Sequence, residues 1–241
     1  MRRSSFTVVP SVIALGTITA AAQADVLIDN VAEPIRGITI LGTAKPDILW
    51  AAQSFSTPSP VRLDTIDVLV GLATDKPDVV AELRSGSDPS GPALATFIVP
   101  ALDPAGPTAA TLTPDAAVVL KPGEAYWLVL GCATTGSFGW AYAEGNGYVG
   151  KGSFLEYAYS EDSGVSWWIA GTDNPHQLRV NVTTGCLCPA DFDCDGFITG
   201  VDFDLYVQAF ENGDASADFD GDTFITGVDF DLYVQAFEAG C

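Results

Sequence analysis

Short apolar runs separated by Pro- and Gly-rich turns make up most of the chain between residues 25 and 184. The runs alternate apolar with polar positions or are rich in β-branched and aromatic residues, which is typical of strands. We expect about ten strands: Val26–Ile28, Ile48–Phe55, Leu63–Val70, Val79–Leu83, Ala93–Val99, Tyr126–Leu130, Gly139–Ala143, Phe154–Tyr159, Val165–Ile169 and Leu178–Val182. The pattern predicts a mainly β domain over residues 25–184, an antiparallel sandwich or jelly-roll, with no helix before residue 200.

After a linker at residues 185–190, the pattern changes to a repeat with a period of 27 residues. The fifteen residues from Phe197 to Glu211 recur without change from Phe224 to Glu238, so a module over residues 191–241 contains an internal duplication, with repeats at 191–213 and 218–240. Apolar residues at helical spacing follow position 12 of each repeat and predict that a helix opens there, with two such faces packing about a pseudo-twofold axis: Phe203, Tyr206, Val207 and Phe210, then Phe230, Tyr233, Val234 and Phe237.

Each repeat places oxygen donors at loop positions 1, 3, 5, 7, 9 and 12. Positions 1, 3, 5 and 12 are carboxylates, position 7 offers a backbone carbonyl, and position 9 offers a hydroxyl or a bound water. The donors are Asp191, Asp193, Asp195, Phe197, Thr199 and Asp202 in the first loop and Asp218, Asp220, Asp222, Phe224, Thr226 and Asp229 in the second. An acidic surface turn does not explain this spacing twice. A chain that wraps oxygen ligands around one hard cation suits Ca²⁺, whereas Mg²⁺ demands a tighter octahedral geometry and fits less well. We expect two Ca²⁺ ions, with a less regular second site because Thr223 replaces the Gly expected at position 6.

This module resembles the dockerin type I family, which carries Asp rather than Glu at position 12 and lacks a helix before the loop. It is most similar to planctomycete-like C-terminal modules that begin Cys-Pro-Ala-Asp and end Gly-Cys, here Cys188 to Asp191 and Gly240-Cys241. The resemblance implies the calcium ligands given above, a Cys188–Cys241 disulfide that clasps the two ends, and a cohesin-like or envelope protein as partner. Positions 10 and 11 are Gly200-Val201 and Gly227-Val228, so such a partner would meet an apolar surface.

The remaining cysteines and the charge add to this picture. Pairing Cys132 with Cys186 is a guess by elimination, which leaves Cys194 as a free or intermolecular thiol. The net charge is −21, and residues 191–241 hold thirteen Asp or Glu and no Lys or Arg, which disfavours nucleic acid and anionic membrane as partners. Residues 1–24 are typical of a signal peptide, with Arg2 and Arg3 before an apolar stretch and an Ala22-Gln23-Ala24 cleavage site, and no later stretch suits membrane insertion. We therefore expect a secreted or cell-surface protein.

The β domain carries weaker functional signals. Residues 25–184 resemble exported β-sandwich domains of the choice-of-anchor type, on phrases such as Gln53-Ser54-Phe55 and the run from Leu120 to Leu130. The stretch from Ser160 to Trp167 fits the Asp-box pattern, which implies a structural hairpin with a buried Trp. The single histidine, His176, is interpreted as a turn or strand-edge residue because no nucleophile motif accompanies it.

Two alternatives to a non-catalytic, displayed domain stay open. Aromatic residues suggest a sugar-stacking platform, and adjacent Trp167 and Trp168 are expected on opposite faces; the set is Trp50, Tyr126, Trp127, Tyr142, Tyr157, Trp167 and Trp168. A small glycoside hydrolase would need two facing carboxylates, for which the sequence offers Glu82, Glu124, Glu144 and Glu156 without any fixed spacing. We expect no enzyme activity, with a carbohydrate-binding component or glycoside hydrolase of a polysaccharide-degrading assembly as the alternative.

Overall fold

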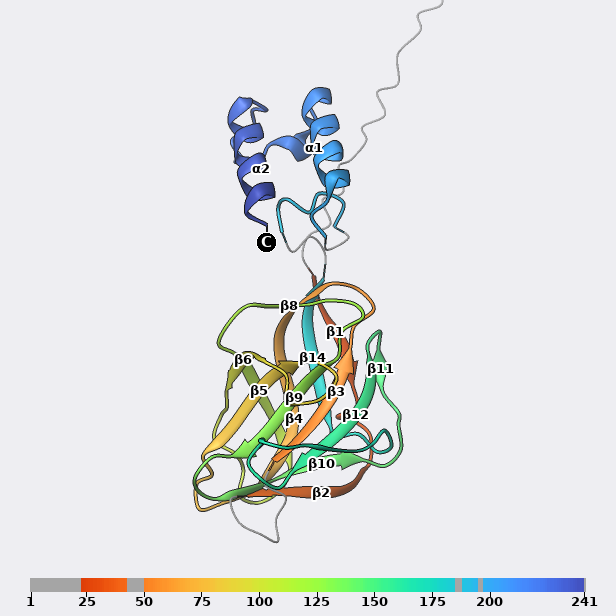
Figure 1. Ribbon diagram of the computed structural model, residues 1–241, viewed down its shortest axis with the longest axis vertical. Helices are drawn as coiled ribbons and strands as arrows, with labels where there is room; N and C mark the ends of the chain where they lie inside the picture. The colour runs from red at the N-terminus through yellow and green to blue at the C-terminus, as the bar shows by residue number, and fades with distance from the viewer. Residues whose placement is uncertain (1–22, 43–49, 185–187, 195–196, 241) are drawn as a thin grey trace, which may run out of the picture.

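The computed structural model describes residues 23–42, 50–184, 188–194 and 197–240 (Figure 1). The predicted signal peptide lies outside this part except for Gln23 and Ala24, which open the first strand. Cys186, Cys241 and the loop residue Asp195 also lie outside it. Among the described residues, no helix has the length and apolar character needed to cross a membrane.

The described part of the chain between residues 23 and 184 consists of antiparallel strands. Those that match the predicted runs are β1 (Gln23–Asp29), β3 (Trp50–Ser56), β4 (Val61–Thr74), β5 (Val79–Ser85), β6 (Ala93–Ile98), β9 (Tyr126–Cys132), β10 (Ser137–Ala143), β12 (Ser153–Ser160), β13 (Trp168–Gly171) and β14 (Leu178–Thr184). Those not expected are β2 (Ile35–Gly42), β7 (Thr108–Pro114), β8 (Val118–Leu120) and β11 (Val149–Gly150). The prediction of a mainly β chain with helices only after residue 200 is confirmed for the described residues.

The strands form one curled sheet (Figure 1). Its hydrogen-bonded order is β11-β1-β14-β4-β7-β6-β5-β9-β3-β12-β13, with β10 pairing β2 and β4, and β8 pairing β4. The last strand, β14, lies between β1 and β4, with Val180 opposite Ile28 on one side and Ile66 on the other. The first and last strands of the β domain therefore lie side by side, near one end of the sheet order.

The burial pattern explains why the sheet curls. Along β9 all seven positions are buried, because alternate side chains enter two different clusters. Leu128 and Leu130 belong to the main core, whereas Trp127 and Val129 pack with Trp50 on the other face. Strand β9 is therefore covered on both faces, which a flat sheet with one solvated face does not provide.

The C-terminal part contains helix α1 (Gly200–Asn212), the short 3₁₀ helix η1 (Ala215–Ala217) and helix α2 (Gly227–Ala239). Its apolar core is built around Tyr206 and Tyr233 and uses residues between 188 and 237 only. The main β core uses residues between 27 and 182 only. The two parts therefore bury their apolar side chains in separate cores.

Each helix begins two residues earlier than predicted, at position 10 of its loop rather than position 12. The reason is a capping box. The Thr199 hydroxyl accepts a hydrogen bond from the Val201 N–H (3.1 Å), and the Asp202 carboxylate accepts one from the Thr199 N–H (2.8 Å). Thr226 and Asp229 repeat this arrangement in the second copy. Thr199 and Asp202 thus start a helix in addition to any role as ligands.

Candidate metal sites

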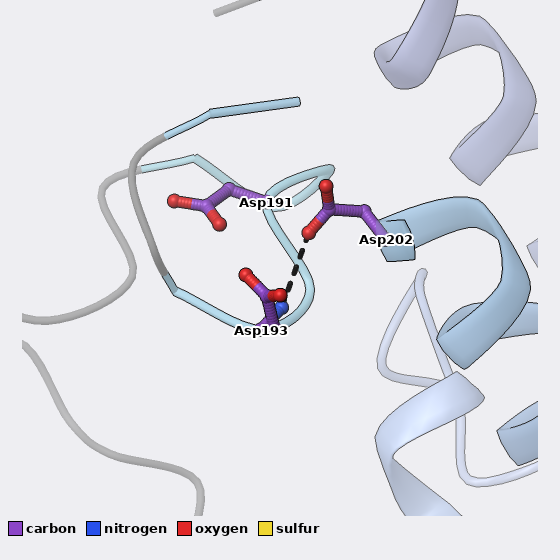
Figure 2. Close-up of side chains that lie close together, drawn as sticks. All are labelled: Asp191, Asp193 and Asp202. Carbon is purple, nitrogen blue, oxygen red and sulfur yellow. Dashed lines mark hydrogen bonds between the residues drawn. The ribbon is translucent and has the colours of Figure 1, made fainter. Parts of the chain in front are cut away.

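Three carboxylates of the first loop converge on one space (Figure 2). One oxygen from each of Asp191, Asp193 and Asp202 lies within 4.8 Å of the others. Asp191 and Asp202 are buried, whereas Asp193 is exposed. The structure thus brings together the carboxylates predicted at positions 1, 3 and 12. This is a donor set that suits a hard cation.

In the second loop, the carboxylates that converge are those of positions 1, 3 and 5. One oxygen from each of Asp218, Asp220 and Asp222 lies within 4.8 Å of the others, and Asp229 is not part of this cluster. The backbone N–H of Thr223 donates to Asp218 (2.8 Å), and that of Gly221 donates to the same carboxylate (2.9 Å). These bonds wrap the loop around its first carboxylate.

Asp202 and Asp229 are fully buried and anchor the helix to the start of its own loop. Asp202 accepts hydrogen bonds from the N–H groups of Phe192 (2.8 Å) and Asp193 (3.2 Å), and the Asp229 bonds are equivalent. Desolvation acts to raise the pKa of Asp202, but its hydrogen bonds together hold that pKa below its usual value. Both oxygens of position 12 are therefore oriented by backbone donors.

The clusters have no positively charged neighbour within the module. Residues 191–241 contain no Lys or Arg, so the carboxylates that meet in each loop repel one another. A bound cation removes this repulsion and uses the oxygen donors together. The donor chemistry of both loops therefore fits a divalent, oxygen-preferring ion.

Two loop positions adopt left-handed backbone. Position 4 has φ +63° at Cys194 and +76° at its equivalent Gly221. Position 6 of the second loop has φ +73° at Thr223, a conformation that strongly disfavours a β-branched residue. The expected irregularity of the second loop therefore takes the form of backbone strain at Thr223. The side chains of Phe197 and Phe224, whose carbonyls are predicted ligands, point away from the core and are exposed.

The structure corrects two of the cysteine assignments. Cys132 is a free, buried thiol, so the predicted Cys132–Cys186 bond is wrong. Cys132 is the last residue of strand β9 and packs within the main core. Cys194 was predicted to be a free or intermolecular thiol; it is disulfide-bonded, so the free-thiol alternative is wrong. Cys188 is disulfide-bonded as well. The Cys188–Cys241 pairing stays a prediction because Cys241 lies outside the described residues.

His176 is a strand-edge residue, as predicted: it forms an isolated β-bridge with Tyr142 shortly before β14, and it is buried. Only 1% of its surface is exposed, and its Nε2 lies 3.1 Å from the Thr39 hydroxyl. Its ring lies among those of Trp140, Tyr142, Tyr157 and Tyr159. Desolvation lowers the pKa of His176 to about 3, which keeps the imidazole neutral.

Several of the aromatic residues predicted to form a sugar-stacking platform are buried. Trp50, Tyr126 and Trp127 are buried and unavailable to a ligand. Trp168 is 51% exposed, while its neighbour Trp167 packs beside Trp50, so the expectation of opposite faces is confirmed. The ring of Trp168 lies 5.1 Å from that of Tyr159, which in turn lies 5.6 Å from that of Tyr157.

The Asp-box stretch forms the predicted hairpin between β12 and β13. Asp162 accepts hydrogen bonds from the Ser160 hydroxyl and the Ser166 N–H (both 2.8 Å), and the Trp167 indole donates to the Gly164 carbonyl (3.1 Å). Trp167 is partly rather than fully buried. The hydrogen bonds from Ser166 and Ser160 lower the pKa of Asp162 to about 2. These interactions give the motif a structural role.

Two of the carboxylates considered for glycoside hydrolysis have structural partners. Arg84 forms an ion pair with Glu82 (2.7 Å), and the Tyr126 hydroxyl donates to Glu124 (3.0 Å). Glu82 lies in strand β5, and Glu124 lies in the turn before β9. Each of these contacts stabilises the fold locally.

Sequence reasoning missed the way in which the two repeats contact each other. The rings of Tyr206 and Tyr233 are stacked 3.7 Å apart at 4°. The Tyr206 hydroxyl donates to the Ala217 carbonyl, and the Tyr233 hydroxyl donates to the Ala190 carbonyl, both at 3.3 Å. Because each contact recurs with the repeats exchanged, the module has pseudo-twofold symmetry. The helical spacing identified both tyrosines as core residues but did not indicate their hydrogen-bond partners.

The pseudo-symmetry also produces two equivalent open pockets at positions 10 and 11. One is lined by Gly200 and Val201 with Phe237 from the other helix, and the other by Gly227, Val228 and Phe210. Val201 and Val228 are each 56% exposed. Asp204 and Asp231 lie at equivalent places in the two pockets. The surface at positions 10 and 11 is thus apolar, as the Gly-Val pairs predicted, and an acidic residue lies beside each pocket.

No protein-family model matches this chain, and no curated protein matches it. The interpretation of the two loops therefore depends on their residues and geometry.

Proposed function

We propose that residues 191–240 bind two Ca²⁺ ions and that this module docks or anchors a secreted, non-catalytic β domain at a cell surface or in an extracellular assembly. The observation that carries the proposal is the convergence of three carboxylates in each of two duplicated loops. The resemblance to the dockerin type I family and the signal-peptide pattern at residues 1–24 support the docking role and the export. The two-sided burial of β9 supports a sandwich or jelly-roll for the β domain.

Equilibrium dialysis with radioactive calcium in excess magnesium tests the ion. We expect two calcium ions per chain, because the donors are all oxygen and their spacing around the loop suits Ca²⁺ better than the tight octahedral geometry that Mg²⁺ demands. Binding of no calcium, or of calcium only when the magnesium is left out, would reject this assignment.

The docking role is tested on the two equivalent pockets. We expect a partner whose contact surface is apolar with basic residues around it, because Val201 and Val228 are exposed near Asp204 and Asp231. The immobilised full chain is incubated with solubilised cell envelope, with calcium and with a chelator. A double variant, Val201→Asp with Val228→Asp, should lose any calcium-dependent partner that the wild type retains. Equal retention by both proteins would contradict docking through these pockets.

A second candidate function is carbohydrate binding by the β domain, favoured by the half-exposed Trp168 beside Tyr159. An exposed indole next to a phenol offers stacking to the apolar face of a sugar. Trp168→Ala should abolish binding on a glycan array, whereas Tyr148→Ala, which removes an exposed aromatic ring elsewhere, should not. An array on which the wild type binds nothing would reject this candidate.

A further inference from the structure

The two tyrosines at the centre of the module each contact the loop of the other repeat. Tyr206 lies on α1 of the first repeat, and its hydroxyl donates to Ala217, the residue directly before Asp218 of the second loop. Tyr233 lies on α2 of the second repeat, and its hydroxyl donates to Ala190, directly before Asp191 of the first loop. Each bond therefore crosses from one repeat to the entry of the other loop.

These contacts are fully buried, so water cannot replace them. Tyr206, Tyr233, Ala190 and Ala217 are all 0% exposed. A buried carbonyl that loses a donor in such a place cannot recover the hydrogen bond from solvent. The position of each loop's first carboxylate therefore depends on a hydroxyl from the other repeat.

Ring contacts also join each loop to both tyrosines. Phe192, which follows Asp191, lies edge-on to Tyr206 (5.6 Å) and Tyr233 (6.3 Å). Phe219, which follows Asp218, lies edge-on to Tyr233 (5.7 Å) and Tyr206 (6.3 Å). The first carboxylate of each loop thus has two anchored neighbours in the sequence. The alanine before it accepts a hydrogen bond from the tyrosine of the other repeat, and the phenylalanine after it packs against both tyrosine rings.

We propose that Tyr233 is a positioning residue for the first cation loop and Tyr206 for the second, each acting across the pseudo-twofold axis rather than on its own repeat. The inference rests on the proposed calcium binding. Its physical basis is that a loop binds an ion more tightly when its first carboxylate is already held in place. The effect of each hydroxyl is therefore expected in the loop that lies farther away in the sequence.

Calcium titration of the labelled full chain by nuclear magnetic resonance tests the proposal site by site. The amides of Phe192 and Asp193 report on the first loop, and those of Phe219 and Asp220 report on the second, because each donates to the position-12 carboxylate of its loop. The variants Tyr206→Phe and Tyr233→Phe are matched controls for each other. Each removes one hydroxyl and keeps the stacked ring.

Tyr233→Phe should raise the calcium midpoint of the first-loop amides about fivefold, the effect of one hydrogen bond, and leave the second-loop midpoint within twofold. Tyr206→Phe should do the reverse. A merely structural role of the tyrosines would weaken both loops equally in each variant, and a local role would weaken the variant's own repeat. Either pattern would overturn the proposal.

A second measurement needs no tyrosine variant. Asp193→Asn, which weakens the first loop, should shift the ring resonances of Tyr233 more than those of Tyr206, and Asp220→Asn should do the reverse; equal shifts would overturn the proposal. A wild-type spectrum that does not respond to calcium would overturn the calcium assignment itself. If the wild type responds to calcium but neither tyrosine variant weakens the loop of the other repeat, the tyrosine inference alone would be overturned.

Discussion

Replacing Thr223 by glycine should strengthen the second calcium site. Thr223 is an exposed residue at loop position 6, and its backbone has φ +73°. Its N–H donates to the Asp218 carboxylate (2.8 Å), so the loop needs this backbone orientation in order to close around its first ligand. The strain is therefore a feature of the folded loop rather than of a packing contact.

The expected gain follows from two opposing terms. A residue with a Cβ in left-handed backbone costs roughly 1–2 kcal/mol. Glycine relieves that cost but loses about 0.5–1 kcal/mol through the greater freedom of the unfolded chain. The net gain is about 1 kcal/mol, or about a fivefold lower dissociation constant at the second site.

Calorimetric calcium titration of Thr223→Gly and Thr223→Ala checks this reasoning. Alanine keeps the Cβ and hence most of the strain, so its second-site affinity should stay within about twofold of the wild type. Glycine should give the fivefold gain without changing the first site. The reasoning would be refuted if alanine gave the same gain as glycine, or if glycine weakened the second site.

Three further predictions concern single residues. Asp202→Ala should abolish binding of the first ion in a calorimetric titration and should destabilise helix α1 by about 1 kcal/mol, because the helix loses its cap. The control variant Asp204→Ala, which changes a pocket residue, should still bind two ions in the same titration. Because desolvation, with the charge of Asp78, raises the pKa of Cys132 to about 11, this thiol should resist a thiol reagent in the native protein and react with it after unfolding without reductant, as mass mapping of the labelled residue would show. Because the pKa of His176 is lowered to about 3, against about 6.5 when unfolded, its contribution to stability is complete above about pH 6.5 and falls by up to about 1.4 kcal/mol per pH unit below it. Urea unfolding followed by tryptophan fluorescence should show this fall in the wild type and a smaller one in His176→Gln; parallel pH profiles would contradict the assignment.

Much of the β domain could be predicted because its apolar runs alternate or are strongly β-forming. Strand β7, which was missed, has a weaker signal because it is built mainly from Thr and Ala (Thr108–Pro114), and β2 is rich in Ile but interrupted by Gly37. Each pairs with a strand distant in sequence, β7 with β4 and β2 with β10. Such pairing depends on tertiary register, which local patterns do not specify.

The candidate sites were predicted from spacing, but their detailed geometry was not. Spacing predicted that Asp202 is a ligand, whereas its capping role depends on the helix beginning at Gly200. The state of Cys132 depends on which strands surround it, so elimination over the cysteine count gave a wrong partner. The burial of His176 likewise results from aromatic residues contributed by β10 and β12.

The most direct test of the calcium assignment is a calcium titration of chelated full-length protein, read by circular dichroism and tryptophan fluorescence together. All five tryptophans lie between residues 50 and 168, so their emission reports on the β domain alone. Calcium should increase the helical signal, because repelling carboxylates precede α1 and α2, and should leave the tryptophan emission unchanged. A helical signal that does not change with calcium, with no heat of binding in calorimetry, would contradict the account.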